Sequence, residues 1–391
     1  MPSWSNWSGR IHCSPAEHPV PRTDDEVATI VRDAADAGRI VRMRGTGHSN
    51  TALCATDGVL VAPEGLAGVE TIAPDRSTAT VGSGTVLADL AAALQAEGLA
   101  LHNLGDIDVQ TIGGATGTGT HGTGPALGNV ATAIVGARIV TADGAITTCS
   151  PEERPELFAA ARVSLGGIGI VTALTLAVVP TYRLHERIWH GPGGEVLGTL
   201  ADHIAATRHY EFFWFPHRDL VEHKALAFTE ADPDPLADRK RERIDHWNAI
   251  LPSRRELRFN EMEYSVPAVA GPACFAALRT WMLAERPDVQ WPVEYRTVAG
   301  DDIWLSPHTG RPSVTISVHL GADADCEALF RAAEPILLAH DGRPHWGKVH
   351  FRTGADLAPR YPHWDDWWRV RDEHDPDDRF LNDHLASLRG R

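Results

Sequence analysis

A glycine-rich turn with one histidine, Arg44-Gly45-Thr46-Gly47-His48-Ser49, is the first segment whose residue types could do chemistry. Glycines let the backbone approach a phosphate or a ring closely, because they lack a Cβ atom and tolerate positive φ. Short turns of this composition also occur without any ligand, so these six residues alone favour an ordinary turn over a cofactor site. A second glycine-rich segment makes a cofactor site the better explanation.

The second segment runs from Asn103 to Gly124 and also carries a histidine, His121. Its glycine content would destabilise a helix or a strand, so the pattern predicts a long ordered loop. Successive backbone N–H groups in such a loop can bind an anion, and several threonine hydroxyls add donors. Flexible linkers of this length are usually rich in Ser and Pro, which favours a ligand-binding loop here.

Two later clusters combine acidic, basic and aromatic groups. Glu294 and Arg296 alternate with Tyr295 on a predicted strand, so their side chains should point to the same face. Taken alone, such a pair is typical of an ion pair on a solvated strand. His345-Trp346-Gly347-Lys348 follows a predicted turn at residues 341–344, which would present an imidazole, an indole and an ammonium group together. A surface loop explains the second cluster equally well.

The elements that must position these residues alternate between short strands and helices. Residues 24–38 predict an amphipathic helix, because acidic residues begin it, apolar residues share one face, and Gly38 ends it. Apolar runs predict strands at 40–43, 59–61, 69–72 and 78–82, a helix at 86–97, and strands at 133–140, 145–149 and 171–179. This order is typical of an α+β fold.

Pro180 ends the last of these strands, and the composition changes beyond it. Most of the Trp, His and Phe residues lie from Trp189 onward, which suits either a pocket for a polar small molecule or an aromatic core. Residues 231–243 are charged and contain Pro, and they predict an exposed loop that leads into a helix. We therefore expect a domain boundary near residue 180.

Composition narrows the classes of function. A chain of 391 residues with 43% hydrophobic content suits two domains with a sizeable core, and a net charge of −16 argues against nucleic acid or an anionic membrane as the main partner. The five cysteines are scattered, and the 20 histidines form no HExxH pattern, so neither a disulfide framework nor a metal site is expected. The N-terminal residues do not resemble a signal peptide and no apolar run could span a bilayer, which predicts a cytoplasmic protein.

Seven segments together resemble the vanillyl-alcohol-oxidase-type flavoproteins and, within them, the sugar-1,4-lactone oxidase and alditol oxidase family. They are Asn6-Trp7-Ser8-Gly9, the turn that contains His48, Asn103-Leu104-Gly105, Thr118 to Gly124, Phe259 to Tyr264, Glu294-Tyr295-Arg296, and His345 to Lys348. Each segment is short, but they occur in the family's order along nearly the whole chain.

This resemblance implies an α+β fold with a two-subdomain FAD-binding domain of the PCMH type at residues 1–180. It further implies a substrate cap at 181–344 and a C-terminal segment at 345–391 that returns to the FAD domain. The flavin 8α-methyl would be bonded covalently to His48. The other residues implied to hold the cofactor are Arg44, Gly45, Thr46, Gly47, Ser49, Gly105, Asp106, Thr111, Gly114, Gly117, Thr118, Gly119, Thr120, His121, Gly122, Gly169, Ile170 and Lys348.

The implied reaction is hydride transfer from a hydroxyl-bearing carbon of a sugar-1,4-lactone to flavin N5, with O2 reduced to H2O2. Lys348 matches the lysine near flavin N1, where an ammonium group stabilises negative charge. Glu294 and Arg296 match residues that hold the reacting hydroxyl and assist its deprotonation, and which of the two is the base stays open. Asp106, His319 and His345 are expected on the substrate side.

Departures from the family pattern keep the substrate open. Asp106 stands where serine is usual, Asn50 where phenylalanine is common, and Thr116-Gly117 where Ile-Ser is more usual. A polyol oxidase and a dehydrogenase with another electron acceptor therefore stay as alternatives. Gly105 occupies a position where a larger side chain shields the flavin from oxygen in a plant relative, which favours an oxidase. A non-catalytic nucleotide-binding protein would have no need of Lys348, Glu294 and Arg296 together. The expected partners are a small polyhydroxylated substrate and O2, and the expected state is a monomer.

Overall fold

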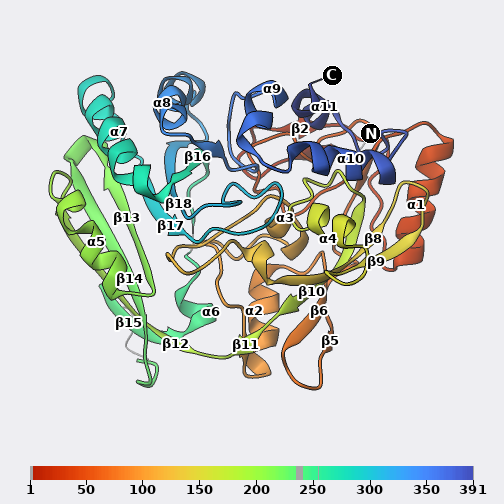
Figure 1. Cartoon of the computed structure of the whole chain (residues 1–391), viewed down its shortest axis with the longest axis horizontal. Helices are drawn as coiled ribbons and strands as arrows, with labels where there is room; N and C mark the ends of the chain where they lie inside the picture. Colours follow the sequence, from red (N-terminus) through yellow and green to blue (C-terminus); the bar gives the residue numbers. More distant parts are fainter. Residues whose placement is uncertain (1–2, 235–240, 254, 391) are drawn as a thin grey trace.

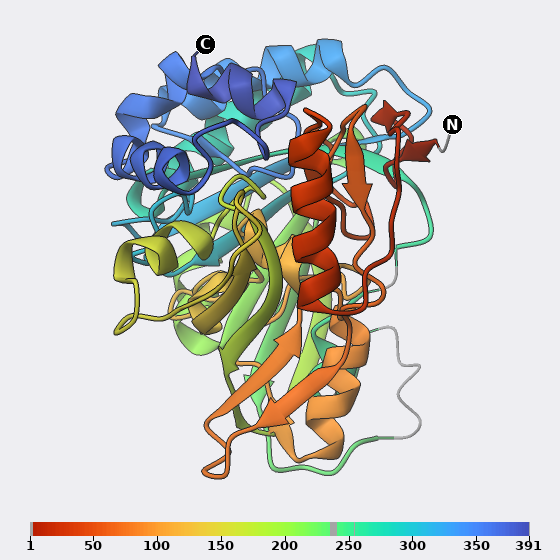
Figure 2. The same ribbon diagram turned by 90° about the vertical axis from the view of Figure 1, so that its right-hand side faces the viewer.

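The computed structural model describes residues 3–234, 241–253 and 255–390. Its elements form an N-terminal unit that extends to about residue 180 and a sheet unit that follows it, with the last helices packed on the N-terminal unit (Figures 1 and 2). Most neighbouring strands in the sheets run antiparallel, and helices and strands alternate along the chain. The predicted α+β fold is therefore confirmed.

The N-terminal unit begins with a hairpin and a small parallel pair beside a long helix. Thr23 caps that helix because its side chain accepts a hydrogen bond from the backbone N–H of Glu26, and Val27, Val31 and Ala34 are buried. The predicted helix at 24–38 is confirmed apart from its last two residues. The elements are β1 (Trp4–Ser5), β2 (His12–Cys13), α1 (Asp24–Asp36), β3 (Val41–Met43) and β4 (Val59–Val61).

A five-stranded antiparallel sheet forms the rest of this unit, in the order β5-β6-β10-β8-β9. The predicted strands at 59–61, 69–72 and 78–82 are confirmed to the residue. The elements are β5 (Val69–Ile72), β6 (Thr78–Gly82), α2 (Leu87–Ala96), β7 (Leu99–Ala100), η1 (Val130–Ala133), β8 (Ile134–Val140), β9 (Ile146–Cys149), α4 (Pro155–Ala161), β10 (Ile170–Ala177) and β11 (Val179–Pro180).

One prediction for this unit is wrong: the glycine-rich segment 103–124 is not wholly a loop. Helix α3 (Ile112–Gly117) lies inside it, and Thr111 caps α3 by accepting a hydrogen bond from the Gly114 N–H at 3.3 Å. Ile112 and Ala115 are fully buried. The cap and this burial offset the cost of helical glycine, which is about 1 kcal/mol per residue.

The sheet unit is built on eight strands in the order β15-β12-β14-β13-β17-β18-β16-β19. Helices α5, α7 and α8 pack on its outer face (Figure 1), where Phe212, Phe275 and Phe330 are fully buried. The elements are β12 (Arg183–Pro192), α5 (Val196–Ala206), β13 (His209–Phe215), η2 (Pro216–Arg218), β14 (Leu220–Phe228), β15 (Glu242–His246), α6 (Trp247–Ile250), β16 (Phe259–Pro267), η3 (Ala268–Ala270), α7 (Gly271–Glu285), β17 (Val293–Val298), β18 (Ser313–Gly321), α8 (Glu327–Ala339) and β19 (Arg343–Pro344).

The loop predicted at 231–243 differs from the structure at its end. Residues 235–240 lie outside the described residues, but 242–246 form strand β15, which pairs with β12, and the helix α6 begins only at Trp247. The charged residues Glu242 and Arg243 belong to this edge strand because their side chains pair with His185 and Glu186 on β12.

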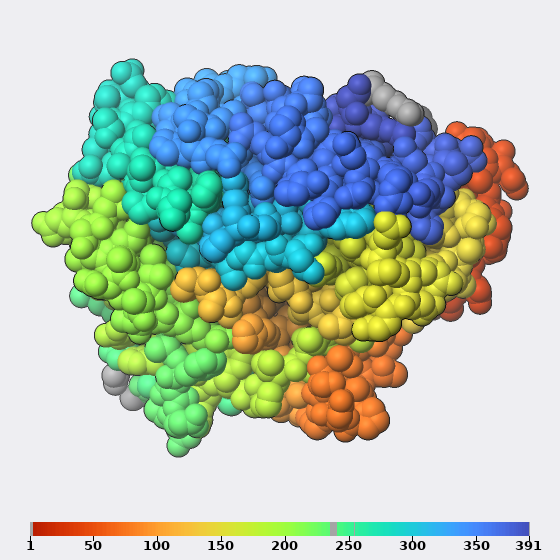
Figure 3. Space-filling model, in the orientation of Figure 1, coloured from red at the N-terminus to blue at the C-terminus, as the bar shows by residue number. Residues whose placement is uncertain are grey.

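The C-terminal residues leave the sheet unit and lie against the N-terminal unit, as the blue segment across the top of the space-filling view shows (Figure 3). The indole N–H of Trp367 donates to the carbonyl of Ala160 at 3.1 Å, and the Asn382 amide donates to the carbonyl of Ala52 at 2.8 Å. The elements are α9 (Gly354–Leu357), η4 (Ala358–Arg360), α10 (Trp364–His374) and α11 (Asp383–Arg389).

Candidate active site

Three cavities meet at His48, which lines all of them. The first cavity runs through the N-terminal unit along residues 42–49, 110–118 and 164–171. We call it the cofactor channel because it contains most of the residues predicted to hold FAD. The inner cavity, of about 80 Å3, lies between His48 and the sheet, where Glu294, Arg296 and Lys348 line it. The outer chamber, of about 1180 Å3, is lined chiefly by β12, β14 and residues within 248–253 and 255–259.

The turn before His48 is shaped by its glycines. Gly47 has φ of +81°, and a Cβ atom at Gly45 would lie 2.6 Å from Thr111 Oγ1. The imidazole of His48 stacks on Trp7, with ring centroids 5.1 Å apart. Burial, and then the nearby charge of Lys348, lower the pKa of His48 to about 4. The imidazole is therefore neutral at pH 7.

The cofactor channel has the features of a site for a polar ligand. Ser83 Oγ and Gln110 Oε1 are buried and have no hydrogen-bond partner in the part of the chain that the structure describes, and both residues line the channel. Buried polar groups are rarely left unpaired in a folded protein, so these two atoms indicate a partner of complementary polarity. Gly45, Gly114 and Gly117 also line the channel, and because they carry no side chain a ligand can approach their backbone closely. The residues fit a ligand that carries hydroxyl and phosphate groups.

Most residues predicted to hold the cofactor line the channel or the inner cavity. In the channel are Arg44, Gly45, Thr46, Gly47, His48, Ser49, Thr111, Gly114, Gly117, Thr118, Gly169 and Ile170. Asp106, Thr120, His121 and Lys348 line the inner cavity instead. Gly105, Gly119 and Gly122 line neither. The Arg44 guanidinium forms an ion pair with Glu64 at 2.6 Å, so its charge is already matched within the protein.

Alternation along three neighbouring strands creates the polar wall of the inner cavity. Glu294 of β17 faces Ser317 of β18, which in turn faces Glu263 of β16. Because side chains alternate between the two faces of a sheet, Arg296, Glu261 and His319 point to the same side as Glu294. All six of these side chains are buried, and the predicted pair of Glu294 and Arg296 thus lies on a cavity wall rather than on a solvated strand.

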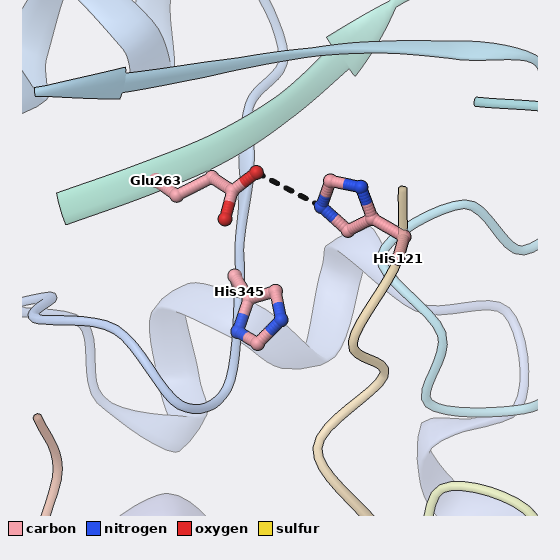
Figure 4. A group of neighbouring side chains, drawn as sticks. All are labelled: His121, Glu263 and His345. Carbon is pink, nitrogen blue, oxygen red and sulfur yellow. Dashed lines mark hydrogen bonds and ion pairs between the residues drawn. The ribbon is translucent and has the colours of Figure 1, made fainter. Parts of the chain in front are cut away.

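Glu263 connects Arg296 to the N-terminal unit. Arg296 donates to Glu263 Oε1 at 2.8 Å, and His121 Nε2 lies 2.9 Å from the same oxygen (Figure 4). The other ring nitrogen of His121 lies 2.8 Å from the Gly122 carbonyl oxygen, so the ring is held between a carboxylate and a backbone carbonyl. Although burial opposes it, Arg296 and His121 hold the pKa of Glu263 well below its usual range.

His345 completes the trio in Figure 4 but is bonded differently. One potential ligand atom from each of His121, Glu263 and His345 lies within 4.8 Å of the others. His345 Nδ1 accepts a hydrogen bond from the Gly347 N–H at 3.0 Å, and burial lowers the pKa of His345 to about 3. The neutral ring then carries its proton on Nε2, and Glu263 is matched by Arg296. These bonds favour a hydrogen-bonding role over metal ligation.

Glu261 holds Lys348 at the edge of the inner cavity. Lys348 Nζ donates to Glu261 Oε2, and His319 Nε2 lies 3.6 Å from Glu261 Oε1. Against the effect of burial, Lys348 and His319 lower the pKa of Glu261 to about 2. The His319 Nδ1 lies 2.9 Å from the Pro292 carbonyl oxygen, which fixes the orientation of the ring.

The carboxyl of Glu294 has a raised pKa, in contrast to that of Glu261. Burial raises its pKa to about 8, and the nearby carboxylates of Glu211 and Asp106 add to the rise, whereas Arg296 opposes it. Glu294 Oε1 and Arg296 Nε form an ion pair at 3.4 Å, and neither atom has a hydrogen-bond partner among the described residues. Two buried, unsatisfied polar atoms that line a cavity can hold a ligand hydroxyl between them.

Asp106 lies at the cavity, but its oxygens are engaged by the sheet unit. Ser253 Oγ donates to Oδ1 at 2.9 Å, Arg255 donates to Oδ2, and Lys224 Nζ is 3.5 Å away. Burial opposes the ionised form, but Lys224 and Arg255 hold the pKa of Asp106 at about 2. Asp106 therefore connects the long loop of the N-terminal unit to β14 and the segment before β16.

Sequence reasoning assigned no role to Glu261, Glu263, Lys224 or Arg255. For the first two a signal existed, because Glu261 and Glu263 flank the apolar Met262 at the period of a strand. For Lys224 and Arg255 no local signal exists. Their importance comes from contact with Asp106, which is more than a hundred residues away in the sequence.

Comparison with known proteins agrees with this geometry. Residues 18–150 match the FAD binding domain family, and residues 236–388 match the D-arabinono-1,4-lactone oxidase family. An L-gulono-1,4-lactone dehydrogenase from Mycobacterium tuberculosis is 34% identical, over 100% of this chain and 99% of the relative. An alditol oxidase from Streptomyces is 30% identical, over 98% of each chain.

The chain belongs to the sugar-1,4-lactone oxidase and alditol oxidase family. The predicted resemblance is confirmed, and so is the assignment of the chain as an FAD-dependent oxidoreductase. A crystal structure of cholesterol oxidase from B. sterolicum superposes with a TM-score of 0.87 at 16% identity, over 99% of this chain and 96% of that one. At that identity the likeness shows the fold alone. Among the described residues, no helix is both long and apolar enough to cross a membrane.

Proposed function

We propose that this protein oxidises a hydroxyl-bearing carbon of a sugar-1,4-lactone, or of a closely related polyol, with FAD held covalently through His48 and with O2 as the electron acceptor. The observation that carries the proposal is the inner cavity itself. There the turn that contains His48 faces a buried wall on which Glu294, Arg296 and Lys348 converge. A binding protein would not need a buried carboxyl, a buried guanidinium and a half-buried ammonium group around one small cavity.

Bound FAD would supply the hydride acceptor. Thr111, Gly114 and Thr118 would hold its polar chain in the channel, and Ser83 and Gln110 would satisfy it with their unpaired oxygens. The lowered pKa of His48 leaves a free lone pair on the imidazole, which a covalent bond to carbon requires. Lys348, held by Glu261, would place a positive charge at the edge of the cavity, where it stabilises developing negative charge.

Arg296 and Glu294 would handle the proton of the reacting hydroxyl. Arg296 is fixed by Glu263 and can donate to the substrate oxygen, which favours the alkoxide form. Glu294 lies beside Arg296, and its ionised carboxylate can accept the proton. Its pKa of about 8 makes it a stronger base than an ordinary carboxylate. Both groups contribute to removal of one proton, with the carboxylate as its acceptor.

The choice of electron acceptor has a second candidate. The relative from M. tuberculosis is named a dehydrogenase, whereas the Streptomyces relative is named an oxidase. Gly105 supports the oxidase, since no side chain projects from this position beside Thr120 and His121. Anaerobic reduction of the purified protein by substrate, followed by air, separates the two. We expect rapid reoxidation with one H2O2 per flavin, and slow reoxidation without peroxide would favour the dehydrogenase.

The covalent bond has its own test. The native protein and His48→Ala are denatured in acid, separated on a gel and viewed under ultraviolet light. We expect flavin fluorescence in the native band and none in the variant. Release of all the flavin from the native protein by acid would contradict the covalent attachment while leaving the reaction itself open to a substrate panel of lactones and alditols with peroxide as the readout.

A further inference from the structure

The outer chamber is much larger than the inner cavity that holds the proposed chemistry. Its volume is about 1180 Å3, against about 80 Å3 for the inner cavity. Pockets that enclose whole drug-sized ligands span about 300–1,000 Å3. The flavin ring at His48 would take only the edge of the outer chamber that His48 and Lys348 line. A single-ring lactone is smaller than a drug-sized ligand, so the flavin ring and the reacting sugar together would still leave much of the chamber to solvent.

The Lys and Arg side chains that line the outer chamber are each paired with a carboxylate. Lys224 pairs with Glu211 at 3.0 Å, and Arg243 pairs with Glu186 at 2.5 Å. Arg255 is bonded to Asp106, and Lys348 to Glu261. Asp108, Glu222 and Glu256 add further carboxylates to the lining. A chamber with paired cations and additional carboxylates disfavours phosphorylated or acidic ligands, but it offers many hydrogen-bond donors and acceptors to a neutral one.

Aromatic rings are interspersed among these polar groups. Trp7, Phe213 and Phe259 all line the chamber, and Trp7 and Phe259 meet edge to face with centroids 5.3 Å apart. Apolar faces beside paired charges suit a sugar ring, which has C–H groups on its faces and hydroxyls around its edge.

The chamber is continuous with the reacting site. His48, Arg255, Phe259, Glu261 and Lys348 line both the outer chamber and the inner cavity. A ligand whose hydroxyl reaches Glu294 and Arg296 can therefore extend past Phe259 and Lys348 into the chamber without leaving the cavity system.

We propose that the outer chamber is a subsite for a second, neutral sugar residue, and that the substrate is a glycosylated polyol or lactone. This inference rests on the proposed oxidation at the inner cavity and names the substrate class of that site. Binding of the remote sugar would contribute to positioning of the reacting hydroxyl, so a truncated substrate should lose turnover as well as affinity.

The test compares sorbitol with maltitol, its glucosyl derivative, and a 1,4-lactone with its O-glucosyl derivative, on the purified holoenzyme. We expect kcat/KM to be about tenfold or more higher for the glycosylated member of a pair, and titration calorimetry of maltitol to show tighter binding than sorbitol. Equal or lower kcat/KM for every glycosylated member would overturn this inference alone. Absence of turnover with all four compounds would overturn the proposed function as well.

Variants that fill the outer chamber test whether the preference for the glycosylated substrate arises there. Ile188 lies on β12 opposite Lys224, and Ala249 lies on α6, and both line the chamber away from the inner cavity. Ile188→Trp and Ala249→Phe should each lower the ratio of kcat/KM for maltitol over sorbitol about fivefold or more. Ile146→Trp, at an exposed position of β9, is the matched control and should leave that ratio unchanged. An unchanged ratio in both chamber variants would contradict the assignment of the subsite.

Discussion

At the scale of single residues, the buried carboxyl of Glu294 should determine the pH dependence of the reaction. Its raised pKa of about 8 means that the group is mostly protonated at pH 7 and ionises as the pH rises. Because the proposed proton acceptor is the carboxylate, kcat/KM should rise with pH and level off above about 8. Glu294→Gln should remove this rise and lower kcat about 100-fold or more, as stopped-flow flavin reduction between pH 6 and 10 would measure. A full rise in the variant would assign the titration to another group.

Glu263 is a positioning residue at the same scale, since it acts through Arg296. In Glu263→Gln, Arg296 and His121 both lose their carboxylate partner, so the guanidinium should no longer be fixed toward the substrate. We expect kcat to fall about tenfold or more while flavin content stays constant. Glu334→Gln is the matched control, because Glu334 is an equally buried carboxylate that bonds Arg352 and Tyr264 on the far side of the sheet. Equal effects of the two variants on kcat would indicate a structural role alone.

At the scale of elements, α3 shows how a short helix shapes the channel. Thr111→Val removes the hydroxyl that accepts from the Gly114 N–H, and loss of such a cap costs about 0.5–2 kcal/mol. We expect a lower Tm together with faster loss of flavin from a His48→Ala background, measured by the absorbance of released FAD. Thr353→Val removes the cap of α9, which lies outside the channel, and should lower Tm without changing flavin release.

Local patterns predicted the elements, whereas the site required contacts between them. The strands at 59–61, 69–72 and 78–82 were predicted to the residue because short apolar runs end there at turn residues. Helix α3 was not predicted, since its burial and its cap outweigh its glycines only in the folded chain. The common face of Glu294 and Arg296 follows from strand periodicity, but its burial depends on strands β13 and β18 on either side. Lys224 and Arg255 gain their partners only through the fold.

At the scale of the whole molecule, the inner cavity depends on segments from both ends of the chain. Its lining includes His48 and Ser49 from the first fifty residues, Glu294 from the sheet unit, and His345 and Lys348 just before the C-terminal helices. The Asn50 backbone N–H donates to the Gly347 carbonyl at 2.7 Å, which joins the two ends directly. Displacement of the C-terminal helices should therefore disturb the turn that carries His48.

Arg42 is the side chain that should reveal this dependence most clearly. It is 2% exposed, and its guanidinium donates to the carbonyls of Leu53, Leu165, Gly166 and Phe380, so one group joins the beginning, middle and end of the chain. Burial lowers the pKa of Arg42 to about 10, which still leaves it charged at pH 7.

Arg42→Met should leave several of these carbonyls without a donor, at about 1–3 kcal/mol for each one that water cannot reach. We expect a large fall in Tm and reduced flavin content, measured by calorimetry and by the ratio of flavin to protein absorbance. Arg39→Met is the control, because Arg39 is 41% exposed and pairs only with Glu17 among the side chains of the described chain. It should change stability by about 0.5 kcal/mol or less. An equal Tm for the two variants would contradict this role of Arg42. Apolar packing around Trp367 and Phe380 would then hold the ends of the chain together, and the turn that carries His48 would not depend on Arg42.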